Sequence, residues 1–352
     1  MSLKTMKKWP RVLVLVLLLC GLFYYFYLYI FIKSSNKAVL VKTLCDSRNI
    51  SQKWESLNFN VSRSEKLFLN LEDFFWQLYL SKLSLPYGVK GSELFLAKVL
   101  AAMTSYDMPG KIKNLPCRSC VVVGNGFVIK NSSLGNAINN YDIVIRLNNA
   151  PVRGYEDDVG NKTTMRLFYP ESASFDPGLQ NDPGTLMVLV PFKQKDVIWL
   201  KEILYNEKRT LRKGFWKIPP QIWLAKPSQI RILDPYFMHQ TASRVLHLPI
   251  NTPAKRNKIS SHPTTGILAI YVALNFCDVV HIAGFGYPDS KNIKYPIHYY
   301  GHDTMKSMKN SYHNLSTEAK ALKRLEDSGA VVNLCRSPVL TKAQPKLLYT
   351  VF

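Results

Sequence analysis

Apolar runs that stop at glycine or asparagine turns constrain the fold of this chain more than any other feature. Residues Cys120–Val123 form a short apolar run, and Gly124-Asn125-Gly126 follows it directly. A second run, Asp142–Leu147, ends at Asn148. Buried strands that end in such turns and alternate with helices are typical of an open α/β sheet, which binds ligands beyond the carboxyl ends of its strands. We therefore expect both turns to belong to one binding site.

The same alternation continues along the chain and predicts a single α/β domain with a central, mainly parallel sheet flanked by helices. Two segments before the first strand, Leu67–Leu83 and Ser92–Thr104, are also expected to be helices that pack on this domain. The remaining strands are expected at Thr164–Tyr169, Leu186–Pro191, Ile230–Leu233 and Val279–Ala283, and the remaining long helices at Lys195–Asn206 and Thr265–Cys277.

The N-terminal residues predict a membrane anchor. Basic residues are concentrated within residues 1–11, and residues 12–32 carry no charge. That length spans a hydrocarbon core as a helix and exceeds the apolar part of a signal peptide. Basic residues on the N-terminal side favour a cytosolic N-terminus and a lumenal remainder. We expect a cytoplasmic tail (1–11), a signal anchor (12–32), a polar stem (33–64) and a lumenal domain (65–352).

The charge of the chain favours an anionic ligand. Lys and Arg outnumber Asp and Glu by 46 to 24, which gives a net charge of +22. The basic residues are spread along the sequence without a Lys/Arg block, so nucleic acid is not expected as a partner and a small anionic substrate fits better.

The cysteines are consistent with an oxidising lumen. Five of them lie outside the predicted anchor, at positions Cys45, Cys117, Cys120, Cys277 and Cys335. Pairing would leave at least one of these unpaired or bridged to another chain. Cys117 and Cys120 also have the spacing of half a zinc or redox site. No second pair of this kind follows, which favours disulfides.

Two turns have the composition of anion-binding sites. Gly124-Asn125-Gly126 would let backbone amides approach a phosphate, although Ile129 stands where a dinucleotide motif has its third glycine. His262-Pro-Thr-Thr-Gly266 places hydroxyls at a helix N-terminus, where free amides attract anions. The alternatives are a plain tight turn for the first, and for the second a threonine that merely caps the helix.

Two histidines are candidates for acid–base chemistry, because imidazole titrates near neutral pH. His298 lies in the aromatic segment Tyr295–Tyr300, and His313 begins a segment that ends at Glu318. Both histidines come after the expected strand Val279–Ala283, which ends at Gly284-Phe285-Gly286. Glu318 would orient His313 or neutralise its charged form if the segment folds back.

Four of these stretches, in this order, resemble the animal sialyltransferase family, and most closely its β-galactoside α-2,3-sialyltransferases. The first motif runs from Cys120 through Arg146–Pro151 to Gly160, the second from His262 through Cys277 to Gly286, the third is His298-Tyr-Tyr300, and the fourth is H-x-x-x-x-E from His313 to Glu318. Tyr169-Pro-Glu-Ser172 also fits the family. His262 departs from the pattern, because some relatives carry tyrosine at this position.

The resemblance implies a catalytic domain similar to the nucleotide-sugar transferases of the GT-A type, with CMP-sialic acid as the donor. His298 would contact the donor phosphate, and His313 would be the catalytic base, with Glu318 beside it. Cys120 would pair with Cys277. Cys117 with Cys45 is a candidate second bridge, and the pairing of Cys45, Cys117 and Cys335 is left open. The implied donor-binding residues are Asn125, Asn148, Ser172, His262, Thr264, Thr265, Gly266, Gly286 and His298.

The implied reaction transfers sialic acid to the 3-hydroxyl of a terminal galactose on glycoproteins or glycolipids, with inversion, in the Golgi membrane. A histidine and helix amides suffice to stabilise a monophosphate leaving group, so neither a metal nor another cofactor is expected. The sequence also lacks the Asp-x-Asp motif with which many lumenal sugar transferases bind a metal. The alternatives are a sialyltransferase of α-2,6 or α-2,8 linkage, a catalytically silent glycan-binding protein, and a metal-dependent UDP-sugar transferase. Whether the chain forms a homo-oligomer is left open.

Overall fold

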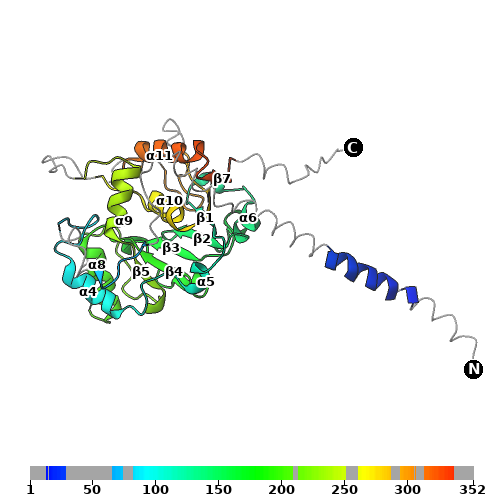
Figure 1. Cartoon of the computed structure of the whole chain (residues 1–352), viewed down its shortest axis with the longest axis horizontal. Coiled ribbons are helices and arrows are strands. Elements are labelled where there is room, and N and C mark those ends of the chain that lie inside the picture. The colour runs from blue at the N-terminus through cyan, green and yellow to red at the C-terminus, as the bar shows by residue number, and fades with distance from the viewer. Residues whose placement is uncertain are drawn as a thin grey trace, which may run out of the picture. The chain divides into compact units, whose positions relative to one another are not determined.

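The computed structural model describes residues 13–14, 16–28, 66–73, 82–208, 213–250, 261–286, 294–304, 306 and 313–336 (Figure 1). The chain divides into two compact units, Met1–Ser47 and Arg48–Phe352. In the first unit residues 16–28 are helical. Within the described ranges, no helix has both the length and the hydropathy needed to cross a bilayer. Residues 12, 15 and 29–32 of the predicted anchor, and the whole predicted stem, lie outside these ranges.

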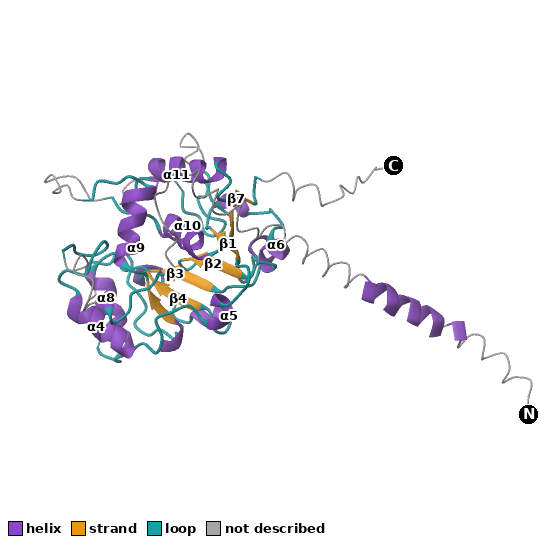
Figure 2. Cartoon of the chain, in the orientation of Figure 1, coloured by secondary structure: helices purple, strands orange, loops and turns teal. Residues whose placement is uncertain are grey.

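A seven-stranded parallel sheet forms the centre of the second unit (Figure 2). Its strands cross the sheet in the order β5-β4-β3-β2-β1-β6-β7, and every neighbouring pair is parallel. The predicted parallel sheet is therefore confirmed, with one short strand, β7, that was not predicted. The strands are β1 (Ser119–Val123), β2 (Ile143–Leu147), β3 (Met165–Phe168), β4 (Leu186–Leu189), β5 (Ile230–Ile232), β6 (Val279–Ala283) and β7 (Val332–Asn333).

The direction of the strand order reverses beside β1. The chain places β1 to β5 successively toward one edge, and then returns so that β6 pairs with the other side of β1. Val123 of β1 lies opposite Ala283 of β6, so the turns that follow these two residues are neighbours. Open α/β sheets bind their ligands at such a reversal, beyond the carboxyl ends of the strands.

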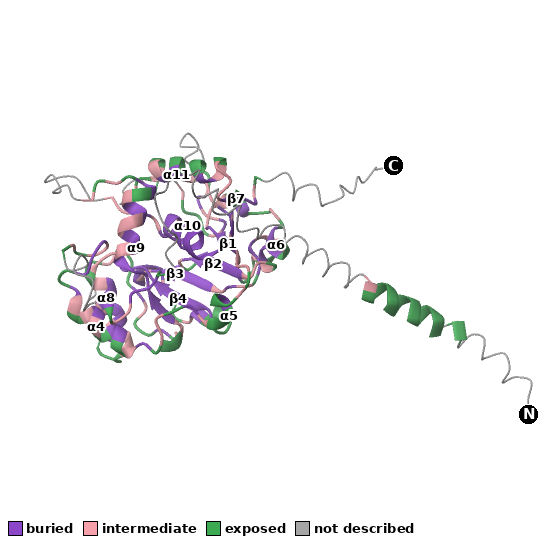
Figure 3. Ribbon diagram, in the orientation of Figure 1, coloured by how far each residue is buried: buried purple, intermediate pink, exposed green. Residues whose placement is uncertain are grey.

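Helices cover both faces of the sheet. Helix α10, which is almost entirely buried, contacts β1, β2, β3 and β6 (Figure 3). Val122 belongs to the core on this face, whereas Val121 and Val123 belong to the core beside α6 and α7, as the two-residue period of a strand requires. Helices α4 and α8 pack together around Phe168 and Trp199.

The α-helices of this unit are α4 (Glu93–Ala102), α5 (Gly110–Lys113), α6 (Gly135–Asn139), α7 (Glu156–Val159), α8 (Gln194–Leu204), α9 (Pro235–Gln240), α10 (Thr265–Phe276) and α11 (Leu315–Asp327). Short 3-10 turns lie at Phe127–Ile129, Pro170–Ser172, Pro177–Leu179 and Pro227–Gln229, and a π-helical turn lies at Thr241–Val245. The predicted helices at 92–104, 195–206 and 265–277 are confirmed as α4, α8 and α10.

The segment that begins at Leu67 is extended, and the predicted helix is wrong for this part. Phe68 forms an antiparallel bridge with Leu233, and the N–H of Leu69 donates to the Ile232 carbonyl at 2.9 Å. The segment thereby pairs with the edge of the sheet beside β5, whose backbone groups would otherwise lack partners. Its apolar side chains are buried in this form. Residues 74–81 of the predicted helix lie outside the described ranges.

A disulfide between Cys120 and Cys277 joins β1 to the end of α10, which confirms the implied pairing. Cys117 is also disulfide-bonded, while Cys45, its candidate partner, lies outside the described residues. Cys335 is a free thiol, and its Sγ accepts a hydrogen bond from the Gly284 N–H at 3.4 Å.

Candidate active site

Two glycine turns meet backbone to backbone where the strand order reverses. The N–H of Gly124 donates to the Ala283 carbonyl at 2.7 Å, and the N–H of Gly126 donates to the Gly284 carbonyl at 2.8 Å. A Cβ added at Gly124 would lie 2.5 Å from the Gly284 carbonyl oxygen, and Gly284 itself has a φ of +72°. Only glycine permits this approach and this conformation. The glycines seen in the sequence are therefore required by the crossing of the two turns.

Asn125, between these glycines, is held by the segment that contains His298. Its side-chain Nδ2 donates to the Tyr300 hydroxyl at 3.2 Å, and its carbonyl accepts from the Tyr299 N–H at 3.0 Å. His298 forms a backbone bridge with Gly126, and its ring stacks on Tyr300 with centroids 5.3 Å apart. The fold thus joins the first motif to the third. The Asn125 Oδ1 is buried and has no hydrogen-bond partner among the described residues.

Asn148 follows β2, the strand next to β1, in the left-handed conformation with a φ of +53°. Its carbonyl accepts from Nη1 of Arg166 at 2.8 Å, and the same nitrogen donates to the Ala150 carbonyl at 3.1 Å. Burial lowers the pKa of Arg166 to about 10, so this guanidinium stays charged at neutral pH. The Asn148 Oδ1 is a second buried amide oxygen without a partner in the described part of the chain. Such oxygens are suited to accept N–H groups from a ligand.

Ser172 lies in the turn after β3. Its hydroxyl accepts from the Tyr169 N–H at 3.0 Å and donates to the Tyr169 carbonyl at 2.9 Å, so it is bonded within the turn. The Tyr169 ring contacts the Phe192 ring edge-on, with centroids 5.7 Å apart. Burial raises the pKa of the Tyr169 hydroxyl, and Glu171 and Tyr300 raise it further. Through Phe192, Tyr169 is linked to the histidines described below.

Helix α10 begins at the predicted anion-binding turn. Thr264 caps the helix, since its hydroxyl accepts from the Ile267 N–H at 3.2 Å. Thr265 is buried in the first turn, and a Cβ added at Gly266 would lie 3.3 Å from the Phe285 ring. The start of this twelve-residue helix thus lies against the turn after β6, with the positive end of its dipole there. Capping and anion binding are compatible here, because the cap uses only one of the free amides.

Glu318, in the first turn of α11, binds the cap of α10. Its Oε1 accepts from the Thr264 N–H and its Oε2 accepts from the Thr264 hydroxyl, both at 2.7 Å. The carboxylate that the sequence assigned to orienting His313 thus fixes Thr264. Burial raises the pKa of Glu318 to about 7, although both bonds from Thr264 act to lower it.

His313 lies against His262 and Phe192. Its Nδ1 is 2.8 Å from the His262 carbonyl oxygen. A carbonyl only accepts hydrogen bonds, so Nδ1 carries the hydrogen and Nε2 carries the lone pair of the neutral ring. The two histidine rings meet edge-to-face at 4.8 Å, and Phe192 stacks on His262 at 4.7 Å. Burial lowers the pKa of His313, and burial together with the nearby His313 lowers that of His262 to about 4. The neutral form is the one that a general base needs.

The remaining predicted residue, Gly286, follows β6 with a φ of +128°, and a Cβ added there would lie 3.5 Å from Nη2 of Arg336. The sequence did not single out Phe192 or Lys193 as site residues. Both follow β4 at the same edge of the sheet as Asn125 and Asn148, so the rule that ligands bind beyond strand ends would have selected them. Within the described ranges, no three His, Cys, Asp or Glu side chains are grouped as metal ligands.

The chain is similar in sequence to known sialyltransferases. The chain is 57% identical over 293 residues to the CMP-N-acetylneuraminate-beta-galactosamide-alpha-2,3-sialyltransferase 4 of Homo sapiens, which covers 83% of this chain and 86% of that protein. It is 47% identical over 254 residues to the type 2 lactosamine alpha-2,3-sialyltransferase of Pan troglodytes, which covers 72% of this chain and 75% of the relative.

The fold is similar to a solved mammalian sialyltransferase in complex with Gal-beta-1-3GalNAc-ortho-nitrophenol. The TM-score is 0.59 at 25% sequence identity, and the match covers 81% of this chain and 94% of that one. Residues 68–330 match the family model of glycosyltransferase family 29 (sialyltransferase). This match spans well over half of the chain, which therefore belongs to glycosyltransferase family 29, the sialyltransferases.

Proposed function

We propose that this chain transfers sialic acid from CMP-sialic acid to the 3-hydroxyl of a terminal galactose on glycoproteins or glycolipids. The observation that carries the proposal is the His313 imidazole, held as the Nδ1–H tautomer by the His262 carbonyl, next to the start of α10. Relatives named as α-2,3-sialyltransferases for β-galactosamide and type 2 lactosamine support the acceptor and the linkage.

The donor would bind along the carboxyl edge of the sheet. The amide oxygens of Asn125 and Asn148, which have no hydrogen-bond partner among the described residues, are suited to accept N–H groups of the nucleotide. The phosphate would meet the first turn of α10 at Thr265 and Gly266, while Gly286 would line the pocket. His298 would donate to the phosphate. Burial lowers its pKa in the free protein, and a bound anion would raise it again.

Transfer would be a single displacement. The bond between C2 of sialic acid and the phosphate oxygen breaks, and its electron pair leaves with CMP, whose charge the α10 amides and His298 stabilise. The galactose O3 attacks C2 from the opposite face, through an oxocarbenium-like state, and its proton passes to Nε2 of His313. One displacement inverts the anomeric configuration. The scheme uses one base and no metal.

The test is transfer by the full chain in detergent, with CMP-sialic acid and a set of β-galactosides, followed by linkage analysis of the product. We expect an α-2,3-linked sialoside at the same rate with and without EDTA. A product of α-2,6 or α-2,8 linkage would favour another member of the family. Glycan binding without turnover would favour a silent binding protein. Loss of activity in EDTA would contradict the metal-free mechanism.

We also propose that residues 12–32 anchor the chain in the Golgi membrane with the catalytic unit in the lumen. The uncharged stretch after a basic N-terminus supports this orientation. Protease protection of tagged chains in sealed Golgi vesicles measures it directly. A C-terminal tag that is digested without detergent would contradict the proposed topology.

A further inference from the structure

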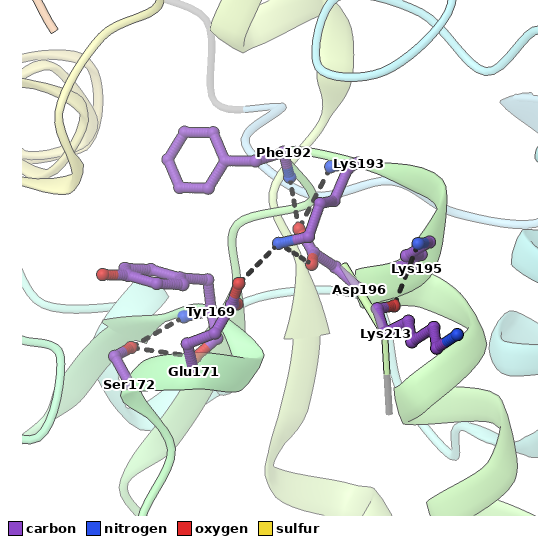
Figure 4. Close-up of polar contacts among 8 residues, drawn as sticks. All are labelled: Tyr169, Glu171, Ser172, Phe192, Lys193, Lys195, Asp196 and Lys213. Atoms are coloured by element: carbon purple, nitrogen blue, oxygen red, sulfur yellow. Dashed lines mark hydrogen bonds and ion pairs between the residues drawn. The ribbon is translucent and has the colours of Figure 1, made fainter. Parts of the chain in front are cut away.

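Three charged side chains form a cluster beside Phe192 (Figure 4). The Lys193 Nζ lies 2.8 Å from Oε1 of Glu171 and 2.9 Å from Oδ1 of Asp196. The two acidic side chains are 1% and 0% exposed, respectively. Glu171 belongs to the turn after β3, and Asp196 to the first turn of α8. The lysine thus joins two connections at the edge of the sheet where the site lies.

Asp196 also holds the backbone that carries Phe192. Its Oδ2 accepts from the N–H of Phe192 and from the N–H of Lys193, each at 3.0 Å. Its other oxygen faces the Lys193 ammonium. One carboxylate therefore fixes the two residues that lead from β4 into α8, in a position where the helix dipole also favours negative charge.

Phe192 transmits this restraint to the histidines. Its ring stacks on His262 at an interplanar angle of 29°, and its centroid is 6.5 Å from that of His313. The Tyr169 ring, which points the same way as Phe192 in Figure 4, contacts it edge-on. Since His262 supplies the carbonyl that binds Nδ1 of His313, a displacement of Phe192 would disturb the base.

We infer that Lys193 is a positioning residue for sialyl transfer, because its bridge between Glu171 and Asp196 fixes Phe192, and through Phe192 the orientation of the His262–His313 pair. The inference rests on the function proposed above, since it assigns Lys193 a part in that reaction.

The charge balance of the cluster explains why the ammonium is needed. Two buried carboxylates face one cation, and burial raises the pKa of Asp196 to about 6 even though Lys193 acts to lower it. Without the ammonium, both buried acids would lose the cation that faces them, so one would take up a proton or turn toward water. Because Asp196 bonds the Phe192 backbone, either response would move the ring. The Phe215 ring, 5.0 Å from the Lys193 Nζ, adds a cation–π contact to the same ammonium.

The experiment compares kcat and KM of full-length variants. Lys193→Met keeps the length of the side chain and removes the charge, and Phe192→Leu removes the stacked ring. We expect each to lower kcat by at least about tenfold, with the KM for CMP-sialic acid within about twofold of wild type. Lys195→Met is the matched control, since that ammonium donates only to the Lys213 carbonyl among the bonds described, at 2.9 Å (Figure 4). It should keep wild-type kinetics.

A double variant tests whether Lys193 acts through Phe192. If it does, Lys193→Met combined with Phe192→Leu loses no more activity than the slower single variant. Losses that multiply would overturn the inference. A second combination tests the charge argument, because Glu171→Gln in the Lys193→Met background removes one uncompensated carboxylate and should restore most of kcat.

Three results separate failure of the inference from failure of the function. A wild-type chain that makes no sialoside would overturn the proposed function. An active wild type together with a fully active Lys193→Met variant would overturn the inference alone. Where Lys193→Met does not fold, as judged by thermal unfolding, Phe192→Leu decides the question, because wild-type kcat in that variant would also overturn it.

Discussion

Nδ1 of His313 lies 2.8 Å from the backbone carbonyl oxygen of His262. A main-chain atom of the second sequence motif therefore sets the tautomer of His313, which begins the fourth motif. The His262 ring takes no part in this bond. A different side chain at position 262 would leave this carbonyl in place, so the hydrogen bond does not depend on the His262 imidazole. The His262 ring instead stacks on Phe192 and meets the His313 ring edge-to-face.

Replacement of the proposed base should separate binding from turnover. We expect His313→Ala to bind CMP as the wild type does and to lose kcat by on the order of 10²-fold or more, since general bases contribute about that much. Calorimetry with CMP and steady-state transfer assays give the two values. His302→Ala, at an exposed histidine of the same region, is the control. Wild-type rates in His313→Ala would remove it from this role.

The pH dependence of kcat/KM should reflect a histidine that resists protonation. Burial lowers the pKa of His313 from its ordinary 6.5, so the base stays neutral as the pH falls through that value. We expect the loss of activity that protonation of His313 causes on the acid side to have its midpoint below pH 6.5. The profile of kcat/KM reports the free enzyme, to which these pKa values apply. A midpoint above 6.5 would contradict the burial argument.

Glu318 should make the protein less stable as the pH rises. Its pKa is raised by burial from 4.5 to about 7, so the folded state binds its proton more tightly than the unfolded state does. This contribution is present below pH 4.5 and is lost as the pH rises through 7, a change of about 3 kcal/mol. Denaturant unfolding at pH 5 and pH 8 measures it. In Glu318→Gln the difference between the two pH values should shrink, and an unchanged difference would show that Glu318 does not titrate this way.

The glycine crossing should be sensitive to a single methyl group. Gly284 and Gly329 both have positive φ, at +72° and +71°, but only at Gly284 would an added Cβ approach a backbone atom, the Gly124 carbonyl oxygen at 2.5 Å. Gly329→Ala should therefore cost about 1 kcal/mol from backbone strain alone. Gly284→Ala should cost more in unfolding free energy and should weaken CMP binding. Equal effects of the two changes would show that the crossing tolerates a side chain.

The sequence was most informative where one local pattern determines the structure. Val121 to Val123 are apolar without interruption and stop at a glycine, which is enough to predict a buried strand and a site at its end. Cys120 pairs with Cys277 as the resemblance implied. The α10 cap was also predictable, because Thr264 precedes an apolar run of helical length.

Other features depend on contacts between distant residues. Leu67 to Leu69 are as apolar as a buried helix, and only the free edge beside β5 makes them extended. The partner of Glu318 is Thr264, 54 positions away, and no spacing rule connects the two. The Lys193 bridge to Glu171 likewise exists only once β3 and β4 are side by side.

The reversal of strand order also determines when during biosynthesis the enzyme can become active. The chain emerges from its N-terminus, so β1 to β5 are made first, whereas β6, α10 and His313 are made near the end. Until β6 pairs with the open side of β1, Asn125 and His313 lie in parts of the chain that have not yet come together. Strand pairing between residues far apart in the sequence is slow. The Cys120–Cys277 disulfide also joins an early part of the chain to a late one, across a sequence separation of 157 residues. A chain that ends before Cys277 would thus leave one edge of β1 without β6 and Cys120 without its disulfide partner.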